Sequence, residues 1–443
     1  MAEIVELGRR AMRSLSGKFD EVAVMVTSKN YVMVKLWNSE PSIVQSWIRS
    51  DVGLYLARDR RVFELEVSVS NIEDILKVAE EIHRYSDKVR ESELYAPLPE
   101  PQEYESLKGT VDSGVLKYME NPRPLAERMI SASLDEGVDR VAGVLKLGVA
   151  RKALVISTGF EGFEEGTEVE AYLRAFKGEY SGHWAYGSRH VDIGRVEEVG
   201  RKAGELAVKA SRKAGFTPGR YDVILSPLVV GNLMNYVAFM ASALHIIMGF
   251  SMFMKHAVGD RVGSEAFTLI DEPRNVELSG SASFDDEGVQ TFNKPIISRG
   301  VLTGLLHNSK TAAKMKASTT GNAGWISPHP WNIEVAPGDY GEEEMVRELG
   351  RGVIITNNWY TRLQNYAEGI FSTVSRDAAL LVEGGEVVGQ VGRVRVADRF
   401  ADVLKNIEGV SRTQYLVKWW EVPTPSKVPY ILVRNVNLTR PYA

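Results

Sequence analysis

The sequence predicts an α+β protein. An N-terminal α/β region of two helix-meander-helix units precedes a large, mostly antiparallel β domain that wraps around a buried central helix. Three observations lead to this fold class. Apolar spacing changes from helical to strand-like and back to helical twice before residue 215. A stretch without any charged residue follows between Asp222 and Lys255. Beyond it, short runs typical of strands dominate.

Length, composition and charge narrow the range of functions. A chain of 443 residues can form two or three domains with a sizeable core. The formal net charge of -5 argues against a nucleic-acid-binding protein, which usually carries a basic excess. Because the chain has no cysteine, disulfides, thiolate nucleophiles and cysteine-bound metals are excluded. The N-terminal residues are acidic where a signal peptide would be basic, so we expect a cytoplasmic protein.

The first unit is predicted over residues 1–95. An amphipathic helix over residues 4–15 opens it, and a helix over residues 72–85 closes it. Between them, apolar runs separated by polar or glycine-containing breaks predict an antiparallel meander. The expected strands are residues 22–26, 31–36, 43–48, 53–57 and 62–69.

A linker over residues 96–121 is predicted next, because Pro97, Pro99 and Pro101 stiffen the chain. The second unit, residues 122–215, opens with a helix at Pro122 and Pro124 that continues to about residue 134. Expected strands at residues 151–158, 168–176 and 180–186 are followed by a helix over residues 196–214. The same order of helix, meander and helix thus occurs twice, either by structural duplication or by chance alternation.

The charge-free stretch is long enough to cross a bilayer, which takes about 20 apolar residues. We reject a membrane span because Pro227 and Gly231 interrupt the stretch and polar side chains such as Asn232 and His245 occur within it. A strand over residues 221–226 that turns at Pro227 into a helix buried on all sides fits better. On this reading, Phe239→Asp should cost several kcal/mol of stability.

The C-terminal domain, residues 219–443, is expected to be rich in strands. Gly384 and Gly385 predict the turn of a hairpin over residues 380–389. Short helices are expected at residues 342–349 and 399–406. Further strands are expected at residues 267–270, 277–281, 294–298, 332–335, 352–356 and 371–374.

Several polar motifs have an ordinary structural explanation beside a functional one. No two of the seven histidines lie three or four residues apart, and His245 is best explained as a hydrogen-bonded core or interface residue. The acidic segment 284–288 favours a solvated turn whose carboxylates cap backbone amides over a calcium site. Residues 318–323, rich in small polar groups, fit a ligand-binding loop and an ordinary turn about equally well.

Several of these segments also carry a resemblance to a known family. Tyr-Asp-Val-Ile-Leu-Ser-Pro at residues 221–227 leads into the apolar helix, and segments 284–288, 300–313 and 318–323 follow in the same order as in the TldD/PmbA family, once called modulators of DNA gyrase. The resemblance covers the C-terminal half and, more loosely, the N-terminal half. It implies a β-rich domain around the central helix.

Catalytic members of that family resemble other zinc peptidases, with two histidines and a glutamate on one helix and a cysteine near the C-terminus. The matching positions here are Met234, Asn235 and Phe239. Methionine and phenylalanine cannot replace imidazole as zinc ligands, and asparagine cannot act as a general base. The chain therefore resembles the family's TldE (PmbA) type, with no metal or cofactor of its own and with zinc expected in a TldD-type partner.

The resemblance implies a non-catalytic TldE-type subunit of a heterodimeric metallopeptidase that degrades small or unfolded peptides. The alternative is a homo-oligomeric, homodimeric for example, peptide-binding or scaffold protein of the same fold. Neither hypothesis involves nucleic acid or a membrane. The candidate substrate-binding residues lie in two loops and are Thr319, Thr320, Gly321, Asn322, Asn365 and Tyr366.

Overall fold

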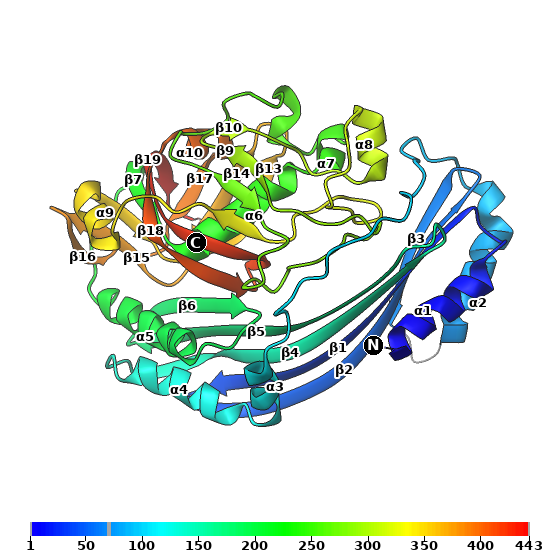
Figure 1. The fold of residues 1–443 in the computed structure, drawn as a ribbon. Helices are drawn as coiled ribbons and strands as arrows, with labels where there is room; N and C mark the ends of the chain where they lie inside the picture. Colours follow the sequence, from blue (N-terminus) through cyan, green and yellow to red (C-terminus); the bar gives the residue numbers. More distant parts are fainter. Residues whose placement is uncertain (1, 69–71, 442–443) are drawn as a thin grey trace.

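The computed structural model describes residues 2–68 and 72–441 and contains two β-sheets (Figure 1). The first has six strands in the order β3-β2-β1-β4-β5-β6, and the second has thirteen. Helices and antiparallel strands are both abundant, so the predicted α+β class is confirmed.

The elements before the linker follow the predicted order. They are α1 (Ala2–Leu15), β1 (Glu21–Trp37), β2 (Glu40–Arg58), β3 (Arg61–Ser68), α2 (Ile72–Tyr85) and the 3-10 helix η1 (Ser86–Lys88). The expected breaks within the meander are wrong, because residues 22–36 and 43–57 form parts of only two long strands. Polar residues such as Ser28 and Lys29 continue the ladder instead of ending it. Val69, the last residue of the predicted strand 62–69, lies outside the described residues.

The second set of elements repeats this order. It comprises α3 (Ser113–Glu120), α4 (Arg123–Leu134), β4 (Arg140–Ile156), β5 (Glu161–Lys177), β6 (Tyr180–Ser188) and α5 (Ile193–Lys209). β4 begins well before the predicted residue 151. Gly143 and Gly148 interrupt the apolar pattern of the sequence. A β-carbon on Gly143 would lie 2.3 Å from Tyr172 O, and one on Gly148 would lie 2.0 Å from the Tyr31 ring. Both glycines therefore allow close packing within a continuous strand.

Pairing of β1 with β4 joins the two meanders into one antiparallel sheet. Figure 1 shows this sheet as a curved trough, with α1 and α2 against one end of its outer face and α4 and α5 against the other. The C-terminal domain lies over the inner face. We retain residues 1–95, 96–121, 122–215 and 219–443 as proposed units of the chain.

The C-terminal domain contains the second sheet, in which β7 pairs in parallel with β12 and β11 pairs in parallel with β19, while every other named pair is antiparallel. Its first elements are β7 (Gly219–Leu225), α6 (Pro227–Met240), α7 (Ala243–Ile247), η2 (Met252–Lys255), β8 (Leu269–Asp271), β9 (Lys294–Ser298), β10 (Val301–Leu302), α8 (Ser309–Met315), β11 (Ile333–Val335) and α9 (Glu342–Leu349). The remaining elements are β12 (Gly352–Ile355), β13 (Asn358–Asn365), β14 (Ile370–Ser375), β15 (Ala379–Glu383), β16 (Glu386–Gln390), β17 (Arg395–Arg399), α10 (Phe400–Lys405), β18 (Ile407–Trp419) and β19 (Val422–Thr439).

The predicted strand over residues 277–281 is wrong. This segment forms successive turns, in which Leu278 N donates to Asn275 O and Ser281 N donates to Leu278 O. Gly280 lies against the backbone of Trp331, where a β-carbon would be 2.3 Å from the carbonyl oxygen. The alternation of residue types in this segment therefore reflects turn packing and not a sheet ladder.

Helix α6 is the predicted central helix, and Pro227 is its first residue. Its apolar side chains belong to the largest core cluster, and α6 packs against β18 and β19. The expectation of burial on all sides is wrong at its C-terminal end, where Phe239 is 41% exposed. Within residues 2–68 and 72–441 no helix has both the length and the apolar character needed to cross a membrane, and α6 has 14 residues.

Candidate functional site

Met234, Asn235 and Phe239 on α6 lie in three different environments. Met234 is 2% exposed and belongs to the core. Asn235 is half-buried, and Phe239 reaches the surface. The three side chains therefore do not form a common metal-binding pocket.

Both ends of the Asn235 amide are used in packing. Its nitrogen donates to Gly231 O at 2.8 Å and to Ser426 Oγ at 3.1 Å, and its oxygen accepts from Thr424 N at 2.9 Å. These bonds hold the start of β19 against α6. A zinc ion does not fit this set of side chains, because a buried thioether, an occupied amide and a phenyl ring offer no imidazole or free carboxylate.

Phe239 packs on His245, with ring centroids 3.7 Å apart. His245 Nδ1 also lies 2.7 Å from Phe239 O, and burial lowers the pKa of this half-buried histidine. His245 is thus a hydrogen-bonded residue of α7 that packs against the end of α6, as its sequence context suggests. Among the described residues no group of three or more His, Asp or Glu side chains is arranged to hold a metal ion.

The loop at residues 318–323 combines accessible and buried groups. Thr319 and Thr320 are half-buried and contact His307 O. Asn322 is fully buried and donates to Asp271 Oδ2 at 2.7 Å. Gly321 has a φ of 66°. The structure therefore leaves Thr319 and Thr320 accessible to a ligand, while Gly321 and Asn322 hold the loop in place.

The acidic segment 284–288 packs against that loop and bonds to its backbone. Asp285 accepts hydrogen bonds from Val289 N and Ala323 N, each at 2.9 Å, which agrees with the predicted capping of backbone amides. The expected solvent exposure is wrong, because Asp285 is 0% exposed and Glu287 is 1% exposed. Burial raises the pKa of Asp285 to about 8, and Glu287 pairs with Lys310 at 3.3 Å. This segment is therefore buried and holds the loop at residues 318–323 in place.

The second candidate loop is the turn between β13 and β14. Asn365 is exposed and accepts from Glu368 N at 3.0 Å, while Tyr366 is 40% exposed and packs its edge against Phe250 at 5.4 Å. The two candidate loops lie near α7 at different places. The first loop bonds to His307, whose neighbour Leu306 bonds to the start of α7, and the second loop contacts Phe250, which follows α7. No hydrogen bond or ring contact joins them directly in the described part of the chain.

The inner face of the first sheet and the C-terminal domain enclose a cavity of about 750 Å³. It lies between strands β1, β4 and β5 on one side and residues 279–283, Trp331 and Lys418 on the other. Its lining includes many charged and hydroxyl-bearing side chains, namely Lys29, Tyr31, Lys146, Arg151, Lys152, Glu164, Glu165, Glu168, Arg189 and Lys418.

Charge pairs across this cavity tie the two sheets together. Glu168 on β5 contacts Lys418 on β18 at 2.5 Å and Lys146 on β4 at 3.1 Å. Burial alone would raise the pKa of Glu168, but the two ammonium groups lower it to about 2. Arg189 is buried and donates to Ser281 Oγ at 2.6 Å. The C-terminal domain is therefore held over the trough by the ion pair of Glu168 with Lys418 and by the hydrogen bond from Arg189 to Ser281.

Sequence analysis does not identify this cavity. A signal is present in β5, where Glu168, Glu170, Tyr172, Arg174 and Phe176 alternate with small or apolar residues that are buried on the other face. That alternation could have shown that one sheet face is polar and aromatic. It could not have shown that residues 279–283, Trp331 and Lys418, which come much later in the chain, cover this face.

Comparisons with known proteins agree with this architecture. The profile of the PmbA/TldA metallopeptidase C-terminal domain matches residues 218–440, and that of the central domain of the same family matches residues 103–210. A solved structure of TldE from Thermococcus kodakarensis superposes with a TM-score of 0.84 at 20% identity, covering 98% of this chain and 99% of that one. A proposed modulator of a DNA gyrase from Thermotoga maritima gives a TM-score of 0.83 at 24% identity, with the same coverage.

Curated relatives match over shorter stretches. A protein named metalloprotease from Methanothermobacter thermautotrophicus is 27% identical over 251 residues, which are 54% of this chain and 55% of the relative. Metalloprotease PmbA of Escherichia coli O157:H7 is 32% identical over 158 residues, which are 35% of this chain and 33% of the relative. The match therefore spans about half or less of the length of these relatives.

Proposed function

Because the chain belongs to the PmbA/TldA metallopeptidase family, we propose that it is a TldE-type subunit that carries no metal and pairs with a metal-bearing, TldD-type paralogue. The pair degrades small or unfolded peptides, and the zinc that cleaves them is held by the partner. This chain contributes part of the chamber in which the peptides bind.

The proposal rests mainly on the packing of three α6 side chains. At the positions that match the family's metal motif, Met234 is packed in the core and the Asn235 amide is bonded to Thr424 and Ser426. The Phe239 ring packs on the His245 ring. These contacts support a role in which α6 keeps its structural place while the metal chemistry belongs to another chain.

Exposed apolar residues support association with a partner. Among the described residues β2 pairs with β3 only from Asp51 onward, and residues 40–50 have no paired strand on the side away from β1. On this edge Val44 is 59% exposed and Ile48 is 76% exposed. A second exposed apolar surface surrounds α7. Monomers rarely leave apolar strand edges uncovered, because such edges pair with other chains.

The cavity between the two sheets supports a role in holding peptides. Its volume of about 750 Å³ falls within the usual range for ligand sites, and its wall offers charged, hydroxyl and aromatic groups. Such a lining suits peptides of varied sequence, because backbone and side-chain groups of either polarity find a partner there.

The test is reconstitution. This chain and a paralogue with the histidine, glutamate and cysteine signature are purified separately and then mixed, and co-elution and peptide hydrolysis are measured. We expect a complex and hydrolysis by the mixture only. A stable homo-oligomer that does not bind the paralogue would support the alternative scaffold function instead.

A further inference from the structure

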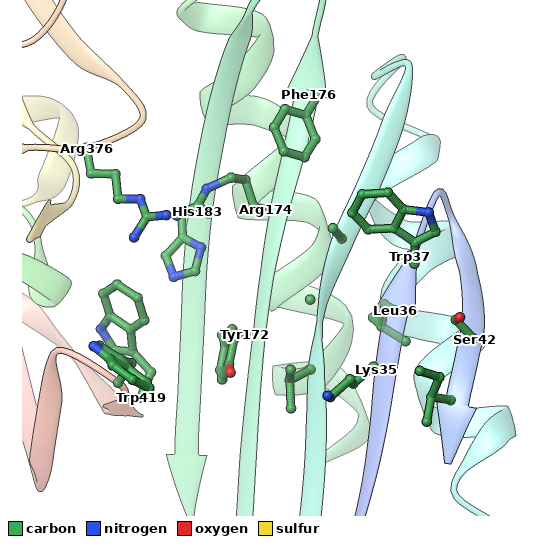
Figure 2. Close-up of a pocket in the computed structure, with 15 residues that line it drawn as sticks. Lys35, Leu36, Trp37, Ser42, Tyr172, Arg174, Phe176, His183, Arg376 and Trp419 are labelled. Carbon is green, nitrogen blue, oxygen red and sulfur yellow. The ribbon is translucent and has the colours of Figure 1, made fainter. Parts of the chain in front are cut away.

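A second cleft, of about 530 Å³, lies on the same inner face of the first sheet, close to the turn between β18 and β19. Figure 2 shows the strands side by side, with lining side chains projecting from them and Trp419 approaching from the C-terminal domain. Arg174, His183, Arg376 and Trp419 lie at one end of the view, and Trp37 and Ser42 lie at the other.

Strand register explains why these residues meet. Tyr172, Arg174 and Phe176 alternate along β5 and share its inner face. On neighbouring strands, His183 lies opposite Arg174, and Val144, which lies opposite Tyr172, also lies opposite Lys35. One surface across four strands therefore presents both cationic and aromatic groups.

Two buried side chains in this cleft have unused polar atoms. His183 is 2% exposed, and neither of its ring nitrogens has a hydrogen-bond partner among the described residues. The same holds for Nε1 of Trp419, which is 5% exposed. Their rings are 4.4 Å apart. Since a buried polar group without a partner is costly, a ligand that reached these atoms would gain by bonding to them.

The charges around the cleft favour an anion. Arg174 is neutralised by Asp377, with contacts of 2.6 and 3.1 Å. Arg376 and Lys35 have no ion pair with a carboxylate in the described part of the chain. Burial lowers the pKa of His183 to about 3, so at neutral pH its imidazole offers one donor and one acceptor and adds no charge. The Asp377 and Glu421 carboxylates lie near Arg376. The three cations outnumber these two carboxylates, so an incoming carboxylate meets net positive charge.

Aromatic side chains form much of the remaining wall. They are Trp37, Tyr172, Phe176, Trp419 and Trp420. Such a lining accepts a large apolar or aromatic group. A free amino acid would bring its ammonium group close to Arg376, and the nearby Asp377 carboxylate is already bonded to Arg174, Ser181 and Asn357. A peptide carries its ammonium group away from its C-terminal residue.

We propose that this cleft binds the C-terminal residue of a short peptide, with the carboxylate at Arg376, His183 and Trp419 and a large apolar side chain among the aromatic rings. The inference rests on the proposed function in taking peptides as the ligands. It goes further by assigning this chain recognition of one end of the peptide and one class of terminal residue.

The test uses the full chain alone, without a paralogue, so that its result does not depend on peptide hydrolysis. Binding of Ala-Ala-Ala-Phe with a free carboxylate, of the same peptide as its C-terminal amide, and of free phenylalanine is measured by calorimetry. We expect the free-acid peptide to bind at least tenfold more tightly than either of the other two ligands. Equal binding of acid and amide, or tighter binding of free phenylalanine, would overturn the proposal.

Two arginines provide a matched pair of variants. Arg376→Gln should remove most of the preference for the acid, while Arg393→Gln, an exposed arginine outside the cleft, should keep it. Unchanged melting temperatures would show that both variants fold. Trp420→Ala should weaken peptide binding. If it weakens assembly with the paralogue and leaves peptide binding intact, the cleft is part of a protein interface and the proposal is wrong. Failure of hydrolysis by the mixed chains would instead count against the proposed function alone.

Discussion

At the scale of single residues, burial differs sharply between neighbouring positions of α6. Met234 is 2% exposed and Phe239 is 41% exposed, although the sequence around both is apolar. Whether a substitution is tolerated therefore depends on the face of the helix from which it projects. A uniform apolar pattern contains no information about that face.

This difference predicts losses of stability of different size for the same substitution. Met234→Asp should destabilise the chain by about 3–5 kcal/mol, because it leaves an unpaired charge in the core. Phe239→Asp should cost about 1 kcal/mol, mainly the lost contact with His245. Urea unfolding of both variants measures the two free energies. Similar losses for the two variants would mean that α6 is oriented differently.

His183 predicts a dependence of stability on pH. Burial, opposed by Asp377 and reinforced by Arg174 and Arg376, lowers its pKa to about 3 from the ordinary 6.5. Between these values the unfolded chain binds a proton that the folded chain does not, so this residue makes stability fall as pH falls. From pH 7 to pH 5 the loss should be about 2 kcal/mol, at 1.36 kcal/mol per pKa unit.

The matched variant for this effect is His183→Gln, which keeps a donor and an acceptor but cannot titrate. Its free energy of unfolding should fall less than that of the parent between pH 7 and pH 5, by about the same 2 kcal/mol. Identical pH profiles for parent and variant would show that His183 is already protonated, or solvated, in the folded chain.

At the scale of elements, local patterns predict those helices and strands that local contacts define. The helix at residues 342–349 and the strand at residues 294–298 coincide with α9 and β9, and the paired glycines do form the turn between β15 and β16. The long strands β18 and β19 are absent from the sequence-based description. The spacing of Pro423, Pro425 and Pro429 is typical of an interrupted strand, yet β19 includes all three, and its pairing with β18 shifts register along its length.

For the candidate site, the sequence indicates the types of residue at each position but not how distant segments meet. Chemistry that depends on residue type, such as the missing ligands at Met234, Asn235 and Phe239, is visible in the sequence. The roles of Gly321 and Asn322 in holding a loop, and the cleft around His183, depend on segments that are distant in the chain. No local pattern contains that information.

A charged substitution on residues 40–50 of β2 should weaken association with a partner chain without lowering the stability of this chain. Ile48→Lys should leave the melting temperature within about 2 °C of the parent, because Ile48 is 76% exposed. It should weaken association with the paralogue at least tenfold, because a charged lysine blocks edge pairing. Val78→Lys on α2, where Val78 is 41% exposed, is the control and should assemble normally. Equal assembly of both variants would exclude this edge from the interface.

At the scale of the whole molecule, the chain is a curved sheet with a second domain clamped over its inner face. Lys418 and Glu168, Arg189 and Ser281, and Arg174 and Asp377 all connect elements far apart in the sequence. The two cavities on this face lie between parts of the molecule that are held together by these contacts. These contacts fit the proposed role of this chain as one wall of a peptide chamber.

The most direct test of the account is metal analysis combined with a peptide-hydrolysis assay on this chain alone, the paralogue alone and their mixture. The account predicts no stoichiometric zinc in this chain, zinc in the paralogue, and hydrolysis by the mixture only. One tightly bound zinc per copy of this chain, or full activity of the paralogue without it, would contradict the account.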